Sequence, residues 1–264
     1  MKPNQKLSQK DGTQVALFPL ENLRITQGVD NVYSHDNTFA IDVNTLGFWD
    51  IAYAPFDCKV MYKTVRFNGV VFQSLKPVLC ADGTQSIVLL GLLHDTNIGD
   101  IKLGQEFKQG DKIYDEGGAG VDGKPRYPHH VHLTVGKTPI KQGENPFFKN
   151  EKNDLEMKGE VHPADILFIN DTNVIKGLNY NWKIFVPPID IGLKIGDKVW
   201  IKKTAIRYAT GQLIPPEYKR GGKYAQRPFT VVFDGNKSLR KLVHGSWLLQ
   251  ELRSWVKAED LEKA

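Results

Sequence analysis

The sequence predicts a mostly β protein built from two domains. The first observation is a set of segments rich in β-branched, aliphatic and aromatic residues, many of which alternate apolar and polar positions. The second is the lack of a long helical period, so helix is expected only at 163–168 and in a final turn from Lys257. The third is a change in composition and charge near residue 180. The predicted strands, separated by Gly and Asp clusters, are 15–18, 38–43, 59–72, 86–93, 130–135 and 198–203.

The domain boundary is expected in a connecting segment. A chain of 264 residues has room for one large or two modest domains. Residues 170–188 begin polar and end in Val186-Pro187-Pro188, and two prolines stiffen a chain without suiting a strand interior. The expected organisation is a first domain at 1–175, a linker at 176–189 and a second domain at 190–264.

Composition excludes several protein classes. Hydrophobic content of 41% and charged content of 25% are ordinary for a globular chain and exclude a disordered or collagen-like one. No apolar run reaches the roughly 18 residues that span a bilayer, so no membrane insertion is expected. The polar N-terminus lacks the apolar core of a signal peptide, so synthesis in the cytoplasm is expected. The two cysteines, Cys58 and Cys80, are too few for a disulfide scaffold; they are expected as reduced, buried thiols, or as a pair if their strands are neighbours.

The positive charge belongs to the C-terminal third. The formal net charge is +5, and residues 188–264 hold 15 basic and 8 acidic residues, a net of +7, against −2 for the rest. A basic domain on a near-neutral body indicates a polyanionic partner: nucleic acid, an acidic membrane or an anionic cell wall. A soluble basic surface without a partner is the alternative reading of the same charge.

A predicted strand at 130–135 presents two imidazoles on one face. Side chains alternate along a strand, so His130, His132 and Thr134 share a face while the three apolar residues between them face the core. Two neighbouring imidazoles on one face are costly if both are charged, but they suit a metal site.

A second strand-like segment at 34–44 offers a carboxylate in the same way. Asp42 falls on the non-core face, and His35 lies just upstream in a loop. His35, Asp42 and one histidine of the H-x-H pair would supply two nitrogens and one oxygen. Three protein ligands with one open position are typical of a catalytic zinc site rather than a structural one.

These residues and their order resemble the lysostaphin-type zinc peptidases that cut peptidoglycan cross-links. Between an early His…Asp and a late H-x-H, the family carries an A-P-x-x-G-x-V strand entry, a strand ending in His and a Gly-rich hairpin. This chain has APFDCKV at 54–60, LLGLLHD at 89–95, IKLGQEFKQGDKIYDEGGAG at 101–120 and HHVHLTVG at 129–136. The gap between His35 and Asp42 is longer than the H-x-x-x-D of many members, a difference that a loop can absorb. The resemblance covers about residues 20–140.

The resemblance implies a role for each matching residue. His35, Asp42 and His132 would bind zinc, and His130 would act as general base or oxyanion stabiliser with help from His94. The family also uses a tyrosine upstream of its first ligand, and Tyr33 is the only nearby candidate. His162 and His244 are expected to be structural. The hairpin at 104–113 also resembles lipoyl and biotinyl carrier domains, but it lacks their exposed lysine turn and leaves the histidines unexplained.

Residues 190–257 resemble bacterial SH3-like cell-wall-binding modules. The segment AIRYATGQLIP at 205–215 and the segment LLQELRSWV at 248–256 carry this likeness. Trp200 and Trp255 are expected in the core, whereas Tyr208 and Tyr218 fall in loop-like stretches and are candidates for wall binding. The basic-aromatic stripe of an RNA-binding sheet is missing, so nucleic acid is not expected as the partner.

Together, the residues and the two resemblances lead to one expectation and one alternative. The expected fold is a lysostaphin-type β-sheet domain of barrel-sandwich-like form, followed by a small SH3-like β-barrel. The expected protein is a zinc metalloendopeptidase that hydrolyses peptidoglycan as a bacteriophage endolysin, acting at the wall after release, with anionic wall polymers as further partners. The alternative is a non-catalytic wall-binding or phage-tail-associated protein on a peptidase scaffold.

Overall fold

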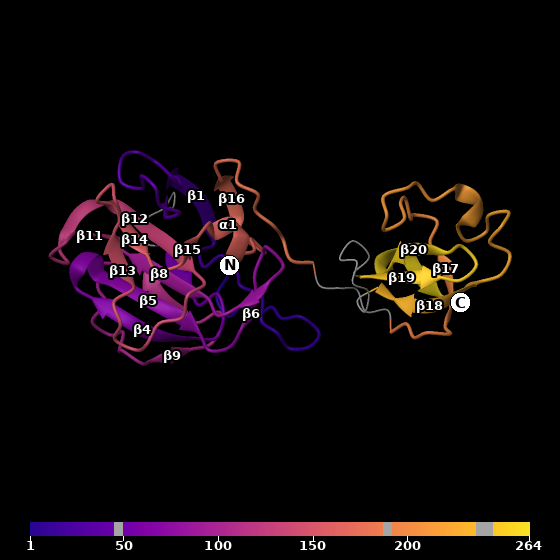
Figure 1. The fold of residues 1–264 in the computed structure, drawn as a ribbon, viewed down its shortest axis with the longest axis horizontal. Helices are drawn as coiled ribbons and strands as arrows, with labels where there is room; N and C mark the ends of the chain where they lie inside the picture. The colour runs from indigo at the N-terminus through magenta and orange to yellow at the C-terminus, as the bar shows by residue number, and fades with distance from the viewer. Residues whose placement is uncertain (45–49, 187–191, 236–244) are drawn as a thin grey trace. The chain divides into compact units, whose positions relative to one another are not determined.

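The computed structural model describes residues 1–264 apart from 45–49, 187–191 and 236–244. The chain divides into an N-terminal unit, Met1–Val186, and a C-terminal unit, Pro187–Ala264. Both units are built mainly of β-strands, so the prediction of a mostly β protein is confirmed (Figure 1).

One large sheet organises the N-terminal unit. Its main path runs β16-β1-β2-β12-β8-β5-β4-β9, and β11 and β15 also pair with β12. These strands are β1 (Asn22–Gln27), β2 (Ile41–Val43), β4 (Cys58–Thr64), β5 (Gly69–Ser74), β8 (Leu89–Leu93), β9 (Glu106–Phe107), β11 (Gly117–Ala119), β12 (Pro125–Gly136), β15 (Glu160–Val161) and β16 (Asn173–Lys176).

Smaller elements surround this sheet. Three further strand pairs and one short helix lie outside its path. They are β3 (Ile51–Tyr53) with β10 (Lys112–Asp115), β6 (Val78–Leu79) with β7 (Gln85–Ser86), β13 (Phe147–Lys149) with β14 (Leu155–Met157), and α1 (Pro163–Ile166). His162 caps α1 by accepting the Ala164 N–H at Nδ1, 3.1 Å away, which agrees with its expected structural role.

The core of the N-terminal unit lies on one face of the sheet, with a smaller apolar cluster on the other. Val131, Leu133 and Val135 of β12 are buried in the main core, as strand alternation predicts. Strand β8, which lies between β12 and β5, is buried along its whole length. Its Gly91 has no room for a side chain, because a Cβ there would lie 2.7 Å from Cγ2 of Thr134. This close approach lets β12 pack tightly beside β8.

Some predicted strands are divided or shortened. The run 59–72 forms β4 and β5 joined by the 3-10 helix η1 (Arg66–Asn68), in which Phe67 and Asn68 have left-handed backbone with φ of 56° and 45°. Residues 15–18 make isolated β-bridges through Val15 and Leu17 instead of a strand. Both deviations are non-local in origin, because Phe67 donates to Gly120 O and Ala16 donates to Leu79 O, and both acceptors are distant in sequence.

The described part of the expected linker packs on the N-terminal unit. Trp182 meets Phe18 edge-to-face at 5.6 Å between ring centroids, and Phe185 is buried against Phe168. The Tyr180 hydroxyl accepts the Val29 N–H at 2.9 Å. Residues 176–186 therefore pack as part of the N-terminal unit.

The C-terminal unit contains a five-stranded sheet in the order β20-β19-β18-β17-β21. The expected barrel is not closed among the described residues, because residues 202–228 form turns and the 3-10 helix η2 (Pro216–Tyr218) rather than further strands of this sheet. Trp200 is only partly buried against its core, and Trp255 is likewise half-buried beside Phe233. The remaining elements are β17 (Lys198–Ile201), β18 (Phe229–Asp234), β19 (Ser246–Leu249), β20 (Ser254–Lys257), the 3-10 helix η5 (Ala258–Asp260) and β21 (Leu261–Lys263).

The cysteines and the helices bear on two of the predictions made from composition. Cys58 and Cys80 are buried free thiols and do not form a disulfide. None of the helices in the described ranges has both the length and the hydropathy that crossing a bilayer requires. His244 lies outside the described residues.

Candidate metal centre

Strand pairing brings Asp42 beside His132. Strand β2 is antiparallel to β12, and Asp42 lies directly opposite His132 in the register. Residues that face each other across two strands point to the same side of the sheet. The Asp42 Oδ1 atom therefore lies 3.1 Å from Nδ1 of His132.

A loop delivers His35 to the same point. Within this loop the backbone N–H of Asp30 donates to Thr38 O at 2.9 Å, which folds the segment back on itself. The hairpin of β13 and β14 also holds the loop, because Asp154 Oδ2 accepts the Asp36 N–H at 2.8 Å. The longer spacing between His35 and Asp42 is thus absorbed by a loop with its own hydrogen bonds.

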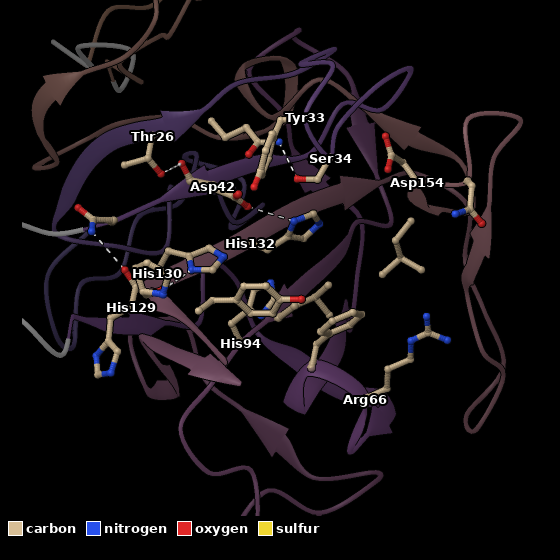
Figure 2. A pocket seen from close by; sticks show the side chains of 18 of the residues that line it. Thr26, Tyr33, Ser34, Asp42, Arg66, His94, His129, His130, His132 and Asp154 are labelled. Carbon is tan, nitrogen blue, oxygen red and sulfur yellow. Dashed lines mark hydrogen bonds and ion pairs between the residues drawn. The ribbon is translucent and has the colours of Figure 1, made fainter. Parts of the chain in front are cut away.

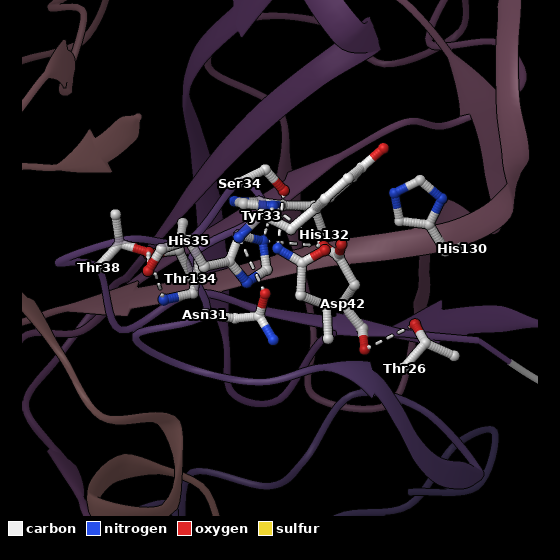
Figure 3. A network of polar contacts seen from close by, with 12 residues as sticks. Thr26, Asn31, Tyr33, Ser34, His35, Thr38, Asp42, His130, His132 and Thr134 are labelled. Atoms are coloured by element: carbon white, nitrogen blue, oxygen red, sulfur yellow. Dashed lines mark hydrogen bonds and ion pairs between the residues drawn. The ribbon is translucent and has the colours of Figure 1, made fainter. Parts of the chain in front are cut away.

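Three ligand atoms converge in a nearly equilateral triangle (Figure 3). His35 Nε2 lies 3.2 Å from His132 Nδ1 and 3.3 Å from Asp42 Oδ1, and the third side measures 3.1 Å. Ligand atoms on one tetrahedral zinc, each about 2.0–2.1 Å from the ion, are about 3.3 Å apart. The described residues thus contain a His-Asp-His group whose donor types and spacing fit a metal ion.

Backbone contacts orient the first of these rings. His35 Nδ1 lies 3.1 Å from Gly28 O and donates to it, which leaves Nε2 directed at Asp42 and His132. A hydrogen bond from the second ring nitrogen is a common support of metal-binding histidines. The Tyr180 hydroxyl packs against Gly28, and a Cβ on that glycine would collide with it. The segment 176–186 therefore helps to position the carbonyl that orients His35.

Hydrogen bonds and charge keep Asp42 anionic in spite of its burial. Burial alone would raise its pKa, but the hydrogen bonds and charges of His132 and His35 hold the pKa of this carboxyl well below its usual range. Burial lowers the pKa of His132 despite the attraction of Asp42. For His35, burial acts in the lowering direction, but the hydrogen bond and charge of Asp42 outweigh it and the pKa is raised. An anionic oxygen with two imidazole nitrogens is a ligand set suited to zinc.

Two further histidines stand beside the triangle. The rings of His94 and His130 are tilted by 37° with centroids 4.3 Å apart, and the His94 centroid lies 6.1 Å from that of His132. His94 donates from Nδ1 to Ala119 O at 2.7 Å, and His130 from Nδ1 to Pro128 O at 2.7 Å. In the neutral form of each ring the proton therefore lies on Nδ1, and Nε2 is the nitrogen with the free lone pair.

The backbone and protonation state of His94 are both unusual. Its φ of 85° is left-handed, and its N–H donates to Phe67 O at 2.6 Å. Burial, together with the charges of His130 and His132, lowers the pKa of His94 to about 3. A ring held in this way stays neutral over the physiological pH range.

An open pocket of about 800 Å³ surrounds the site (Figure 2). Asp42, His132, His130 and His94 all line it. Figure 2 also shows the His129 ring directed away from His130 and His132. The pocket is large enough for several residues of an extended peptide.

The structure thus brings together the five residues expected around a metal, while the three tyrosines differ in their surroundings. Tyr33 lines the pocket with 88% of its surface exposed. In the C-terminal unit Tyr208 is buried in the core, and Tyr218 stacks on Tyr224 with centroids 5.3 Å apart. Burial leaves Tyr208 little surface for a ligand, whereas the Tyr218 ring remains partly exposed.

Sequence reasoning missed several residues of the pocket wall. Their common feature is that they belong to turns and hairpin ends with no motif of their own. They are Arg66, Phe67, Tyr127, Lys149 and Asp154. Alternation along β12 would place Tyr127 on the face opposite His130, since the two lie three positions apart, so the sequence carried no local signal for it.

Comparisons with known proteins give partial matches. No family model matches the chain. It is 31% identical over 173 residues to "Morphogenesis protein 1" of Bacillus phage B103, covering 65% of this chain and 45% of that protein. The chain thus spans less than half the length of this phage relative.

Two solved structures of Helicobacter pylori Csd3 are distant matches. The hexagonal crystal form is 16% identical and covers 52% of this chain and 37% of Csd3, with a TM-score of 0.33. The orthorhombic form is 18% identical and covers 53% and 41%, with a TM-score of 0.30. The comparisons therefore show that this chain is similar in sequence to part of a phage protein. The His-Asp-His group that fits a metal ion is a separate observation, made on the described residues of the structure.

Proposed function

We propose that this chain is a zinc-dependent peptidase that hydrolyses a peptide bond in bacterial peptidoglycan. The observation that carries the proposal is the triangle of His35 Nε2, Asp42 Oδ1 and His132 Nδ1, with sides of 3.1–3.3 Å, on the wall of an open pocket. The resemblance of residues 20–140 to lysostaphin-type peptidases supports the reaction and the substrate. A bound zinc ion supplies Lewis acidity toward a carbonyl oxygen and toward water.

Two histidines of the chain, His94 and His130, would transfer the proton from the attacking water to the leaving amine. The Nδ1 atoms of His94 and His130 donate to backbone carbonyls, so the neutral form of each ring has its free lone pair on Nε2. Both rings can therefore accept a proton from water and pass it to the leaving amine, which is general acid–base work. This tautomer favours the role of base over that of oxyanion donor for His130.

The C-terminal unit would bind the wall. Residues 188–264 carry a net charge of +7, which suits a wall rich in anionic polymers. A second binding site on the same chain raises the local concentration of the peptidase at its substrate. The phage relative supports a setting in bacteriophage biology, where a cell-wall hydrolase would open the host wall.

One preparation can test the enzymatic proposal. Zinc content and lysis of purified walls are measured for the wild type, for His132→Ala and for the control Arg126→Gln, an exposed residue that pairs with Asp122 outside the pocket lining. We expect stoichiometric zinc and lysis in the wild type and the control, and loss of both in His132→Ala. Wall binding without lysis after zinc is added would contradict the proposal.

The name of the phage relative favours a second candidate function. A morphogenesis protein takes part in building a particle, so this chain could be a wall-binding component of a phage particle instead of a free hydrolase. The same experiment separates the two, because a binding component would adhere to walls without lysing them, whether or not zinc is bound.

A further inference from the structure

The turn between β4 and β5 carries a cation into the pocket. Arg66 opens η1, and its guanidinium lies 5.5 Å from the centroid of the Phe67 ring. Both residues line the pocket that contains Asp42 and His132. Figure 2 shows Arg66 toward one end of this pocket, apart from Asp42 and His132.

This turn is held in a strained conformation by buried hydrogen bonds. Phe67 and Asn68 both have positive φ, which is uncommon for residues other than glycine. The Asn68 carboxamide donates to Asp95 O at 2.9 Å, and the Phe67 N–H donates to Gly120 O at 2.9 Å. Phe67 O in turn accepts the N–H of His94. Strained backbone of this kind gathers at functional sites, and here it fixes Arg66 relative to His94.

A second cation lines the same pocket from the β13–β14 hairpin. Lys149 ends β13, and its Nζ donates to Asn153 Oδ1 at 2.5 Å. The hairpin is attached to the His35 loop, because the Asn150 carboxamide donates to Asp36 O at 3.0 Å. The second cation is therefore also tied to the metal-binding end of the pocket.

These two cations lack acidic partners among the residues that the structure describes. No carboxylate in the described parts of the chain forms an ion pair with Arg66 or Lys149. The two acids of the pocket have other contacts: Asp42 belongs to the metal triangle, and Asp154 accepts the Asp36 N–H. An anionic group of the substrate would complete the charge balance.

We infer that Arg66, assisted by Lys149, binds a carboxylate of the substrate peptide. A guanidinium matches the two oxygens of a carboxylate with parallel hydrogen bonds. The inference rests on the proposed peptidase function and narrows its substrate class to stem peptides with free carboxylates. A bridge made only of glycine has no side-chain carboxylate and would leave both cations unpaired.

Peptide binding to a variant that cannot cleave its substrate tests this inference independently of catalysis. The probes are the synthetic stem tetrapeptide L-Ala-γ-D-Glu-L-Lys-D-Ala with free carboxylates and its counterpart with carboxamides at the same positions. Their affinities are measured by calorimetry in the His132→Ala background, which prevents cleavage. We expect the free-carboxylate peptide to bind about 10- to 100-fold more tightly, because hydrogen bonds to charged groups have this effect.

Further substitutions in the His132→Ala background identify the residues that cause the preference for the free-carboxylate peptide. Arg66→Gln should remove most of this preference, and Lys149→Gln should remove a smaller part. Arg126→Gln is the matched control, since Arg126 is exposed, pairs with Asp122 at 2.8 Å and lies outside the pocket lining. Equal affinity for the two peptides, including no binding of either, overturns the inference, as does a preference that survives Arg66→Gln. Wild-type lysis of walls with zinc is scored separately, so the peptidase proposal can fail while the carboxylate preference stands.

Discussion

The buried hydroxyl of Tyr114 gives a sharp test of how the pocket is supported. Tyr114 lies on β10 with 1% of its surface exposed. Its hydroxyl donates to Asn68 O at 2.5 Å and accepts the Asp95 N–H at 3.0 Å. Burial raises the pKa of Tyr114 well above its ordinary value, so the phenol keeps its proton and both bonds.

Tyr114→Phe removes one oxygen and leaves two buried backbone groups without a partner. The ring volume is unchanged, so no cavity larger than the lost oxygen forms. A buried donor or acceptor left unsatisfied costs about 1–3 kcal/mol, which gives about 2–6 kcal/mol for the two groups. Loss of that size is a large part of the 5–15 kcal/mol by which domains are typically stable.

The same substitution should disturb His94. Asn68 and Asp95 flank the contact between Phe67 O and the His94 N–H, which holds His94 at a φ of 85°. We therefore expect wall lysis to fall while zinc content stays stoichiometric, because the triangle of His35, Asp42 and His132 lies on other segments.

Urea unfolding of the isolated Met1–Val186 segment, followed by circular dichroism, measures the change in free energy of unfolding. Tyr62→Phe is the matched control, since Tyr62 packs against Phe147 and its hydroxyl has no hydrogen bond within the described residues. A change below about 0.5 kcal/mol for Tyr114→Phe, or one equal to that of the control, would refute the reasoning.

Three further predictions concern the metal centre and the thiols. Asp42→Asn replaces the anionic ligand by a neutral one and should weaken zinc affinity by more than about 100-fold in a chelator competition assay, a larger loss than removal of supporting hydrogen bonds causes; unchanged affinity would exclude Asp42 as a ligand. The pKa of His94 of about 3 implies that nitrogen NMR finds this ring neutral, with its proton on Nδ1, down to about pH 4. Because an unfolded histidine titrates near 6.5, this group should cost stability progressively as the pH falls from about 6.5 to about 3, and a His94 titration near 6.5 would contradict the assignment. Burial raises the pKa of the Cys58 thiol far above its ordinary value and that of Cys80 to about 11, so neither should react with a thiol reagent at pH 8 before unfolding. Rapid labelling of the native protein would show that one of them is accessible.

Sequence patterns predicted the part of the site that depends only on alternation along a single strand. Alternation along β12 sufficed to place His130 and His132 on one face, since a strand has a period of two residues. The same argument placed Asp42 on the non-core side of β2. The register that sets Asp42 opposite His132 is a non-local property, and only the order of motifs in a known family suggested it.

Positions imposed by distant hydrogen bonds could not be predicted. The left-handed backbone of His94 and Phe67 depends on Gly120 and Ala119, which are distant in sequence. Arg66 enters the pocket only because this turn interrupts what otherwise resembles one long strand at 59–72. Residues 202–228 of the C-terminal unit likewise have strand-like composition in places, yet turns and η2 take up that length.

The contact between Tyr180 and the Gly28–Val29 backbone has a consequence for engineering. A chimera that joins a foreign targeting domain after residue 175 would discard the hydroxyl that accepts the Val29 N–H and packs on Gly28. It would also remove Trp182 from the Phe18 ring. A fusion made after Val186 retains both contacts, and with them the carbonyl that aims His35. The transferable module of this protein therefore ends about eleven residues later than its composition suggests, and shorter versions should express as folded sheets with poor metal retention.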